Sequence, residues 1–436
     1  MEKKILFIFT FLLLIPMTIF SAGAQESVDK ASITVYLTEH SDIVDPIRDK
    51  LADFEKANNI KVNLETVPEG DSTTKLSLIL SSGAEGYDVF YIASVNSVAG
   101  MVNKQFAPIK EYLSAENKSL SDFPSRLLDL LSRDDVLYGL PIRAETNILM
   151  YRKDILKENN LKVPSTLDEY LSVAKALTKG NFYGNAQRGL YGHNAYTFTY
   201  YFRALGGKFF DSNMNPTLYS PEGIEALNLY KELATTYAPP GGGVYGWQDV
   251  FAALQTGLAG MTVESSIQAG LLEDSSKSLF KGKFGYAAPP AGPHGATPDL
   301  KCYGYFINSK SNNKAAAAKF IEWATGVELQ QYAFDKYGFA AITRNSVLES
   351  SQEKAPYFAA IKDAMATGDI YFLPPISEQG AVYMATCQAI SDAFAGTKSV
   401  EQALKDANIE IKKIIEDGGY YKDKTLIPQF IKNGRG

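Results

Sequence analysis

The residue types that most often catalyse reactions or bind metals are scarce in this chain and form no catalytic motif. There are three histidines and two cysteines, and His40, His193 and His294 lie on separate predicted elements without metal-ligand spacing. The sequence contains no His-Glu-x-x-His, no Gly-x-Ser-x-Gly and no phosphate-binding Gly-x-x-x-x-Gly-Lys-Ser/Thr. We therefore predict no catalytic residue, no metal site and no cofactor.

One glycine pattern matches a dinucleotide-binding motif in form. Gly241, Gly243 and Gly246 fit Gly-x-Gly-x-x-Gly, but they follow a predicted helix and the pair Pro239-Pro240. A dinucleotide site needs a strand before the glycines and a helix directly after the first turn. We interpret this segment as a loop.

Carboxylates and aromatic rings are the abundant side chains. The chain has 49 Asp and Glu, 26 Tyr, 24 Phe and 2 Trp, so aromatics make up 12% of it. Such a number of carboxylates leaves a glycosidase pair open, although no local pattern marks one. The aromatic content draws attention to rings as a means of recognition.

Length and charge narrow the class of protein further. The 436 residues are enough for about three domains, or for two large lobes. The net charge of −6 argues against a protein dedicated to phosphate backbones, because such a protein needs a basic face. We expect no nucleic-acid partner.

The amino-terminal segment predicts export. Lys3 and Lys4 precede an apolar run over residues 5–20, and Ala22-Gly23-Ala24 follows. This is the pattern of a secretory signal peptide cleaved after Ala24, with residues 1–24 removed. The alternative is a membrane anchor, but sixteen residues are short for the ~20 that span a bilayer. We therefore expect an exported protein.

Cys302 and Cys387 leave two possibilities open. In an oxidising compartment they could form a disulfide that closes a long loop. They could equally be two separate buried thiols, since free cysteine behaves as a small hydrophobic residue.

The elements that would position functional side chains alternate between strand and helix. Apolar patterns predict strands at 32–37, 61–65, 89–92, 147–152, 259–263 and 303–307. Helical spacing and caps predict helices at 44–54, 73–82, 166–178, 221–237, 315–325, 328–336, 357–366, 381–395 and 400–417. The strand–helix order of the first part predicts a parallel sheet covered by helices on both faces.

Five blocks of sequence, in order, cover nearly all of the chain after residue 24. They are 87–92 (YDVFYI) with 105–109 (QFAPI); 138–141 (YGLP), 147–154 (NILMYRKD) and 163–169 (VPSTLDE); 205–211 (LGGKFFD); 251–262 (FAALQTGLAGMT); and 303–308 (YGYFIN) with 316–323 (AAAKFIEW). Together they resemble the extracellular solute-binding proteins of bacterial ABC transporters, in particular the sugar-binding proteins of the maltose-binding type.

The resemblance implies the periplasmic binding protein fold, in which two α/β lobes are joined by crossover hinge segments and close around a ligand. We expect the crossovers near residues 140–145, 303–307 and 344–349. The N-terminal lobe would then comprise 25–141 plus 305–347, and the C-terminal lobe 142–304 plus 348–436.

The candidate ligand-binding residues follow from the resemblance and from sugar chemistry. Carboxylates and guanidinium groups form charge-assisted hydrogen bonds with sugar hydroxyls, while aromatic rings cover the C–H faces. Open α/β sheets place ligands at strand ends. The candidates are Glu39, His40, Ser94, Asn96, Glu145, Arg188, Tyr196, Trp247, Glu264, Ser265, Gly304, Tyr305 and Tyr383.

Several of these residues have a structural alternative. Ser94 and Asn96 could cap the next helix, Arg188 could be a solvated surface residue, and Trp247 could belong to the core. Tyr305 stands where the resembled family has Trp after the glycine. Trp323 is interpreted as part of a helix core.

The resemblance implies a monomeric receptor without a catalytic step. It would capture a carbohydrate (a monosaccharide, sugar alcohol or short oligosaccharide) in the interlobe cleft and deliver it to the membrane permease of an ABC importer. Two alternatives stay open: a secreted glycoside hydrolase, and a binding protein of the same fold for a non-sugar ligand.

Overall fold

The computed structural model describes residues 31–116 and 120–435. The predicted signal peptide and its cleavage site lie outside these residues. Within the described part of the chain, no helix is long and apolar enough to cross a membrane.

The first sheet begins as the sequence predicts and then departs from the prediction. β1 (Ala31–Thr38) pairs in parallel with β2 (Ile60–Val67) and with β3 (Val89–Ala93). β10 (Leu300–Ile307) joins β3 in the antiparallel direction, and the first half of β6 (Gly139–Arg152) joins β10 likewise. The parallel pairing predicted for the first part of the chain is confirmed for β1, β2 and β3, whereas β10 and β6 add antiparallel strands that the prediction did not include. β10 comes from a distant part of the chain, so no strand–helix–strand crossover forces it to run parallel.

The second sheet shares one strand with the first. The second half of β6 pairs antiparallel with β8 (Ala259–Ser265) and with β9 (Phe284–Ala287), and β8 pairs in parallel with β7 (Tyr183–Asn185). The resulting strand order is β2-β1-β3-β10-β6-β8-β7, with β9 also on β6. A small hairpin, β4 (Ser132–Arg133) with β5 (Val136–Leu137), lies apart. One continuous strand thus connects two sheets.

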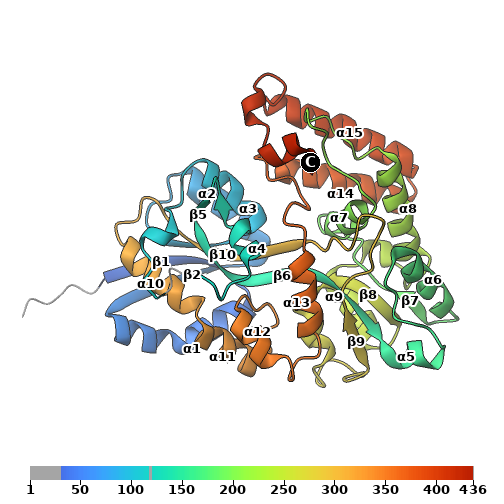
Figure 1. Cartoon of the computed structure of the whole chain (residues 1–436), viewed down its shortest axis with the longest axis horizontal. Helices are drawn as coiled ribbons and strands as arrows, with labels where there is room; N and C mark the ends of the chain where they lie inside the picture. Colours follow the sequence, from blue (N-terminus) through green and yellow to red (C-terminus); the bar gives the residue numbers. More distant parts are fainter. Residues whose placement is uncertain (1–30, 117–119, 436) are drawn as a thin grey trace, which may run out of the picture. The chain divides into compact units, whose positions relative to one another are not determined.

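Helices cover both faces of the first sheet. In the view of Figure 1, α2 and α3 lie on one side of it and α1, α10 and α11 on the other. The bounds are α1 Ser41–Asn58, α2 Glu69–Ser81, α3 Ser94–Val102, α4 Ser125–Leu130, α10 Lys314–Ala324, α11 Val327–Tyr337, α12 Asn345–Ser351 and α13 Phe358–Thr367. The predicted α/β layering is confirmed.

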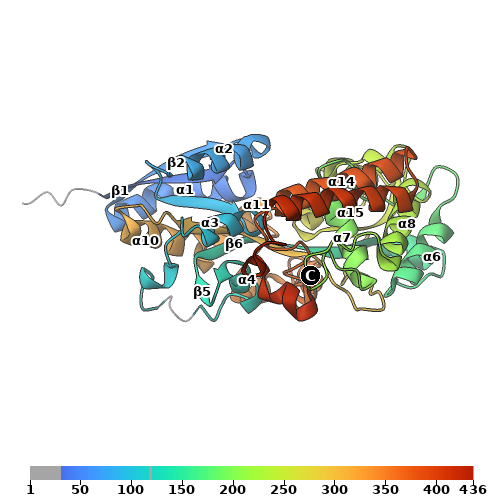
Figure 2. The same ribbon diagram turned by 90° about the horizontal axis from the view of Figure 1, so that it is seen from above.

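The second sheet carries its own helices. Figure 2 shows α14 and α15 running side by side, as their mutual contact also indicates. The bounds are α5 Lys153–Glu158, α6 Leu167–Leu177, α7 Asn194–Ala204, α8 Pro221–Thr235, α9 Trp247–Gln255, α14 Gln379–Ala395 and α15 Val400–Asp417. The helix caps that the sequence predicts are present. Thr166 and Glu169 form the capping box of α6, and Ser220 caps α8 ahead of Pro221.

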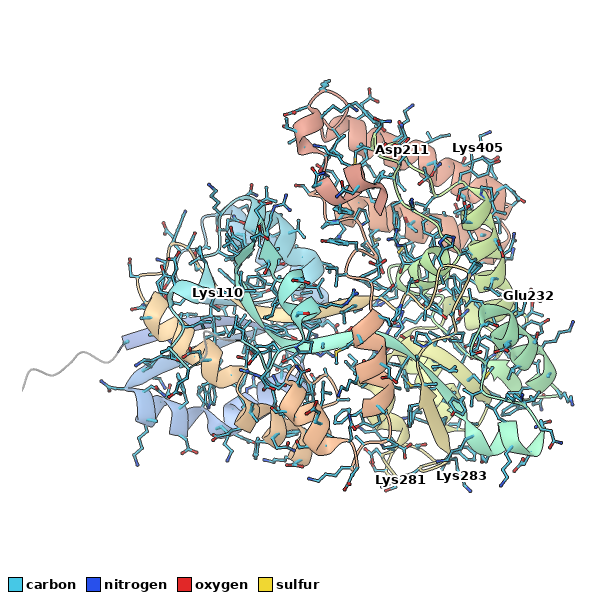
Figure 3. The ribbon with its side chains drawn as sticks, viewed as in Figure 1. Lys110, Asp211, Glu232, Lys281, Lys283 and Lys405 are labelled. Carbon is cyan, nitrogen blue, oxygen red and sulfur yellow. The ribbon has the colours of Figure 1, made fainter. Side chains whose placement is uncertain are left out.

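Two hydrophobic clusters form the core. One surrounds β1, β3 and β10, and the other joins α7, α8, α14 and α15. Tyr200 and Tyr201 of α7 are fully buried in the second cluster. Trp323 stacks on Phe54 at 4.7 Å between ring centroids, which confirms its place in a helix core. Charged side chains such as Lys281, Lys283 and Lys405 lie at the periphery of the ribbon (Figure 3).

The two cysteines are free thiols. Cys302 is buried in the first cluster and Cys387 in the second. Of the two possibilities left by the sequence, the structure shows separate buried thiols.

Asp299 is a buried acid at the start of β10. It is 3% exposed, and its Oδ2 accepts a hydrogen bond from the Thr199 hydroxyl at 3.0 Å. Its Oδ1 has no hydrogen-bond partner among the described residues. Burial raises the pKa of Asp299 well above its ordinary value, and Lys301 offsets this only in part.

We expect Asp299→Asn to stabilise the protein at pH 8. A raised folded-state pKa contributes stability below the unfolded value of 3.8, and that contribution is lost as pH rises through the folded-state pKa. Asparagine does not titrate and still accepts from Thr199. Thermal unfolding should therefore show a higher Tm for the variant at pH 8, with a smaller difference at pH 4. Asp134→Asn is the control, because the Asp134 side chain is 92% exposed. A lower Tm for Asp299→Asn at pH 8 would contradict the assignment.

Candidate functional site

A cleft of about 1280 Å³ lies over the strands that connect the two sheets. His40 and Glu69 line it beside the first sheet, and Arg188 and Trp247 line it beside the second. Further out, residues 334–340 of α11 and the turn after it face the short 3-10 segment Ser266–Leu272. Elements distant in sequence therefore share one cavity.

The floor of the cleft is set by the register of β6 and β10. Glu145 is directly opposite Lys301, and Arg143 is directly opposite Tyr303. Alternate residues of a strand point to the same face, so all four side chains share one face of the sheet. All four line the cleft.

The floor holds a chain of paired charges. Glu145 Oε1 lies 2.8 Å from Arg143 Nη1, and its Oε2 lies 3.0 Å from Lys301 Nζ. On its other side Arg143 Nε lies 3.2 Å from Asp42 Oδ2. Arg143 and Glu145 are each under a tenth exposed. Acid and base therefore alternate along the row Asp42–Arg143–Glu145–Lys301.

Their partners keep Arg143, Glu145 and Lys301 ionised. Burial alone would raise the pKa of Glu145, but Lys301 and Arg143 outweigh it and lower the pKa to about 2. Burial likewise opposes the charge on Lys301 and on Arg143, and their carboxylate partners raise both pKa values. The floor is therefore zwitterionic at neutral pH.

An aromatic group backs the row on one side. Tyr303 stacks on Tyr91 at 5.1 Å between centroids, and His40 meets Tyr303 edge-on at 5.3 Å. The Arg143 guanidinium lies over the Tyr303 ring at 5.2 Å. His40 Nδ1 is 3.0 Å from the Tyr91 hydroxyl, and its Nε2 is 3.5 Å from Glu69. These contacts fix the imidazole at the cleft wall.

A second ion pair lies on the opposite wall. Arg188 Nε donates to Glu264 Oε2 at 2.6 Å, and Glu264 Oε1 accepts from the Ser265 backbone N–H at 2.7 Å. The Arg188 carbonyl accepts a hydrogen bond from the Tyr230 hydroxyl. Arg188 reaches the cleft, whereas Glu264 holds it from behind.

The glycine-rich segment brings Trp247 next to Arg188. The backbone N–H groups of Gly189 and Leu190 both donate to the Tyr245 carbonyl, at 2.9 and 3.0 Å. A Cβ on Gly189 would lie 2.3 Å from the Gly243 carbonyl oxygen, so this approach requires glycine. The interpretation as a loop is confirmed. Trp247 is the first residue of α9 and is half-buried at the cleft wall.

Seven of the thirteen predicted site residues line the cleft. They are Glu39, His40, Asn96, Glu145, Arg188, Tyr196 and Trp247. Glu39 is half exposed and lies 3.8 Å from Arg48. The contact of these residues with a ligand stays a prediction.

The other six, Ser94, Glu264, Ser265, Gly304, Tyr305 and Tyr383, do not line the cleft. The Ser94 hydroxyl accepts from the Cys302 backbone N–H at 3.3 Å and does not cap α3. Gly304 faces Leu131, and Tyr305 is fully buried against Phe320. Tyr383 donates to the Gly192 carbonyl at 2.9 Å and lies behind Tyr196, 4.8 Å between ring centroids. These contacts place the six residues in the core or behind the cleft lining.

Sequence reasoning missed several residues at the site: Asp42, Glu69, Tyr91, Arg143, His193, Lys301 and Tyr303. A signal was present for three of these missed residues, Arg143, Lys301 and Tyr303. Arg143 with Glu145, and Lys301 with Tyr303, are alternate polar or aromatic residues in strands that are otherwise apolar. Such an alternation marks a face that does not belong to the core.

The comparisons with known proteins agree with this architecture. The family model for bacterial extracellular solute-binding proteins matches residues 39–331. The chain belongs to this family.

Relatives and solved structures cover most of the chain. A probable amino-acid ABC transporter periplasmic-binding protein from Sinorhizobium fredii is 26% identical over 85% of this chain and 86% of its own. A mannitol-binding protein from Pseudomonas aeruginosa is 27% identical over 70% of this chain and 75% of its own. The crystal structure of an ABC transporter solute-binding protein from Agrobacterium radiobacter, in complex with ribitol, superposes with a TM-score of 0.79. It is 25% identical and covers 88% of this chain and 99% of that chain.

We expect Glu145→Gln to destabilise the fold by about 3 kcal/mol, because it removes the shared partner of the buried Arg143 and the largely buried Lys301. Arg143 retains Asp42, but Lys301 loses its carboxylate. Urea unfolding monitored by circular dichroism measures the change. Glu39→Gln is the control; it breaks a half-exposed pair and should cost less than about 1 kcal/mol. Equal stability of the two variants would show that the row does not act as a buried unit.

Proposed function

We propose that the protein is the substrate-binding component of an ABC importer that captures a neutral carbohydrate in this cleft and delivers it to the membrane permease. The carbohydrate is a monosaccharide, a sugar alcohol or a short oligosaccharide. The observation that carries the proposal is the charge-balanced floor and wall.

Each cation of that surface already has a carboxylate partner. Arg143 has Asp42 and Glu145, Lys301 has Glu145, and Arg188 has Glu264, all at 3.2 Å or less. A hydroxyl group both donates and accepts, so a polyhydroxylated ligand can bond to both members of each floor pair, and to Arg188 on the wall, without bringing a charge. An anion or an amino-acid zwitterion would have to compete with partners that are in place.

The two-sided lining supports binding coupled to closure. His40 and Glu69 come from the proposed N-terminal lobe, 25–141 plus 305–347, and Arg188 and Trp247 from the proposed C-terminal lobe, 142–304 plus 348–436. A ligand that contacts both lobes binds the closed state better than the open one. β6, which pairs in both sheets, is the natural hinge.

The same charges argue against a hydrolase. A glycosidase acid needs a raised pKa so that it holds a proton near neutral pH. The pKa of Glu145 is instead lowered to about 2 by Lys301 and Arg143. We propose that binding is the whole function of the cleft and that the protein acts as a monomer. It would be exported to the periplasm after cleavage at Ala24.

We expect isothermal titration of the mature protein to show heat of binding with at least one member of a panel of monosaccharides, sugar alcohols and short oligosaccharides. The panel includes amino acids as the comparison that the relative from Sinorhizobium fredii suggests. Binding of an amino acid alone, or no heat with any carbohydrate, would contradict the proposal.

The two tryptophans provide a matched pair for locating the ligand. Trp247→Ala should weaken carbohydrate binding at least tenfold, about 1.4 kcal/mol, and abolish the ligand-dependent change in tryptophan fluorescence. Trp323→Phe should leave both unchanged, because Trp323 stacks on Phe54 away from the cleft lining. If Trp247→Ala changes affinity by less than a factor of ~3, Trp247 does not contact the ligand.

A further inference from the structure

Tyr196 lines the cleft, but neighbouring side chains cover its ring. Lys301 Nζ lies 4.1 Å from the ring centroid, in the geometry of a cation–π contact. Tyr383 and Phe372 contact the same ring, with centroids at 4.8 and 6.1 Å. The ring of Tyr196 therefore offers little surface to a ligand.

The carboxylate of Glu145 holds Lys301 in this position. Its ammonium lies 3.0 Å from Glu145 Oε2, and the strand register places the two residues directly opposite each other. The side chain is 17% exposed. If the ammonium moved off the Tyr196 ring, Lys301 would have to leave the buried carboxylate, which is costly.

The other ring on the floor is covered in the same manner. Tyr303 has the Arg143 guanidinium over it at 5.2 Å and Tyr91 stacked on it at 5.1 Å. His40 closes its edge at 5.3 Å. Tyr196 and Tyr303 thus both have a cation where a ring sugar would place its C–H face.

Trp247 differs from these rings. No other ring and no cation is stacked against it among the residues that the structure describes. It stands on the wall, next to the Arg188 segment. The floor itself is a polar row, and its chemistry is that of alternating donors and acceptors.

We infer that Lys301 is a specificity-determining residue: by covering Tyr196 it removes a stacking face beside the polar floor, leaves a pyranose only the wall ring of Trp247, and so favours an open-chain polyol. The inference rests on the proposed function and narrows its substrate class. A pyranose in an aromatic cleft depends on contact between its C–H face and a ring. An open-chain polyol carries a hydroxyl on every carbon, and each hydroxyl can donate to a carboxylate and accept from a cation of the row.

The test compares ligands of matched configuration. D-mannitol is paired with D-mannose, and D-glucitol with D-glucose, in calorimetric titrations of the full mature protein. The wild type should bind the better polyol at least tenfold more tightly than its ring partner. No binding of any carbohydrate would overturn the proposed function; equal or tighter binding of the ring sugars would overturn this inference alone.

Two substitutions separate the effect of covering the Tyr196 ring from the effect of the Lys301 charge. Lys301→Ala uncovers Tyr196. It should reduce the ratio of polyol affinity to pyranose affinity at least tenfold, partly through a gain in pyranose affinity. Lys301→Met keeps an unbranched chain over the ring without the charge; it should lose polyol affinity and gain no pyranose affinity. Equal pyranose affinity in the two variants would overturn the covering role. If Lys301→Ala shows no cooperative melt, Lys301→Ser replaces it, with the same expected ratio.

A third variant checks the ring itself. Tyr196→Leu removes the aromatic face and leaves Lys301 paired with Glu145. If that face takes no part in binding, the ratio of polyol affinity to pyranose affinity should stay within threefold of the wild-type ratio. A tenfold change in the ratio would show that the Tyr196 ring contacts the sugar despite Lys301.

Discussion

The arrangement of this protein depends on the buried row of charges along β6 and β10. Removing ions from water is costly, and the cost is offset only when each ion has a partner at hydrogen-bonding distance. Here the partners come from opposite strands, so the ion pairs and the strand register depend on each other. A slip of one residue would turn Glu145 and Lys301 to opposite faces and leave both unpaired.

The same row explains why the connecting strands are also the site. β6 runs through both sheets, and its middle residues Ala144, Glu145 and Thr146 are all under a tenth exposed. Apolar residues would satisfy burial there equally well. Under the proposed function, the charged face lies on a surface that both halves of the cleft share, where a ligand would contact it whichever way the walls move. We regard this as the reason that charge is concentrated on the floor.

Much of the fold could be predicted from sequence because its signals are local. The capping box at Thr166 and Glu169 and the Ser220-Pro221 start need only neighbouring residues, and both helices begin where these signals place them. Strand direction is not local. The antiparallel entry of β10 between β3 and β6 depends on residues more than 140 positions apart, and the strand–helix alternation of the first part carries no information about it.

The candidate site residues show the same difference between local and non-local signals. Trp247 and Glu145 could be proposed because they stand beside a glycine-rich loop and an expected crossover, and Arg188 because its segment resembles that of the family. Arg143 and Lys301 were missed because their significance lies in which residue faces them across the ladder. Conversely, Tyr305 and Tyr383 have the right residue type in the right region, but their rings are directed into the core or behind the wall. Residue type suggests chemistry, and only packing decides which face is free to perform it.

Floor and walls then have different physical roles. The floor charges are oriented by one another before a ligand arrives, so a ligand replaces water at groups that are already ordered, and little conformational entropy is lost. Such a surface discriminates, because a hydroxyl in the wrong place leaves a buried ion without its bond. The walls are different: Glu39 and Trp247 come from separate elements and are partly exposed. Under the proposed function, contacts made there would be complete only when the walls approach. Selectivity would then come from the floor, and the free energy that favours closure would come from the walls.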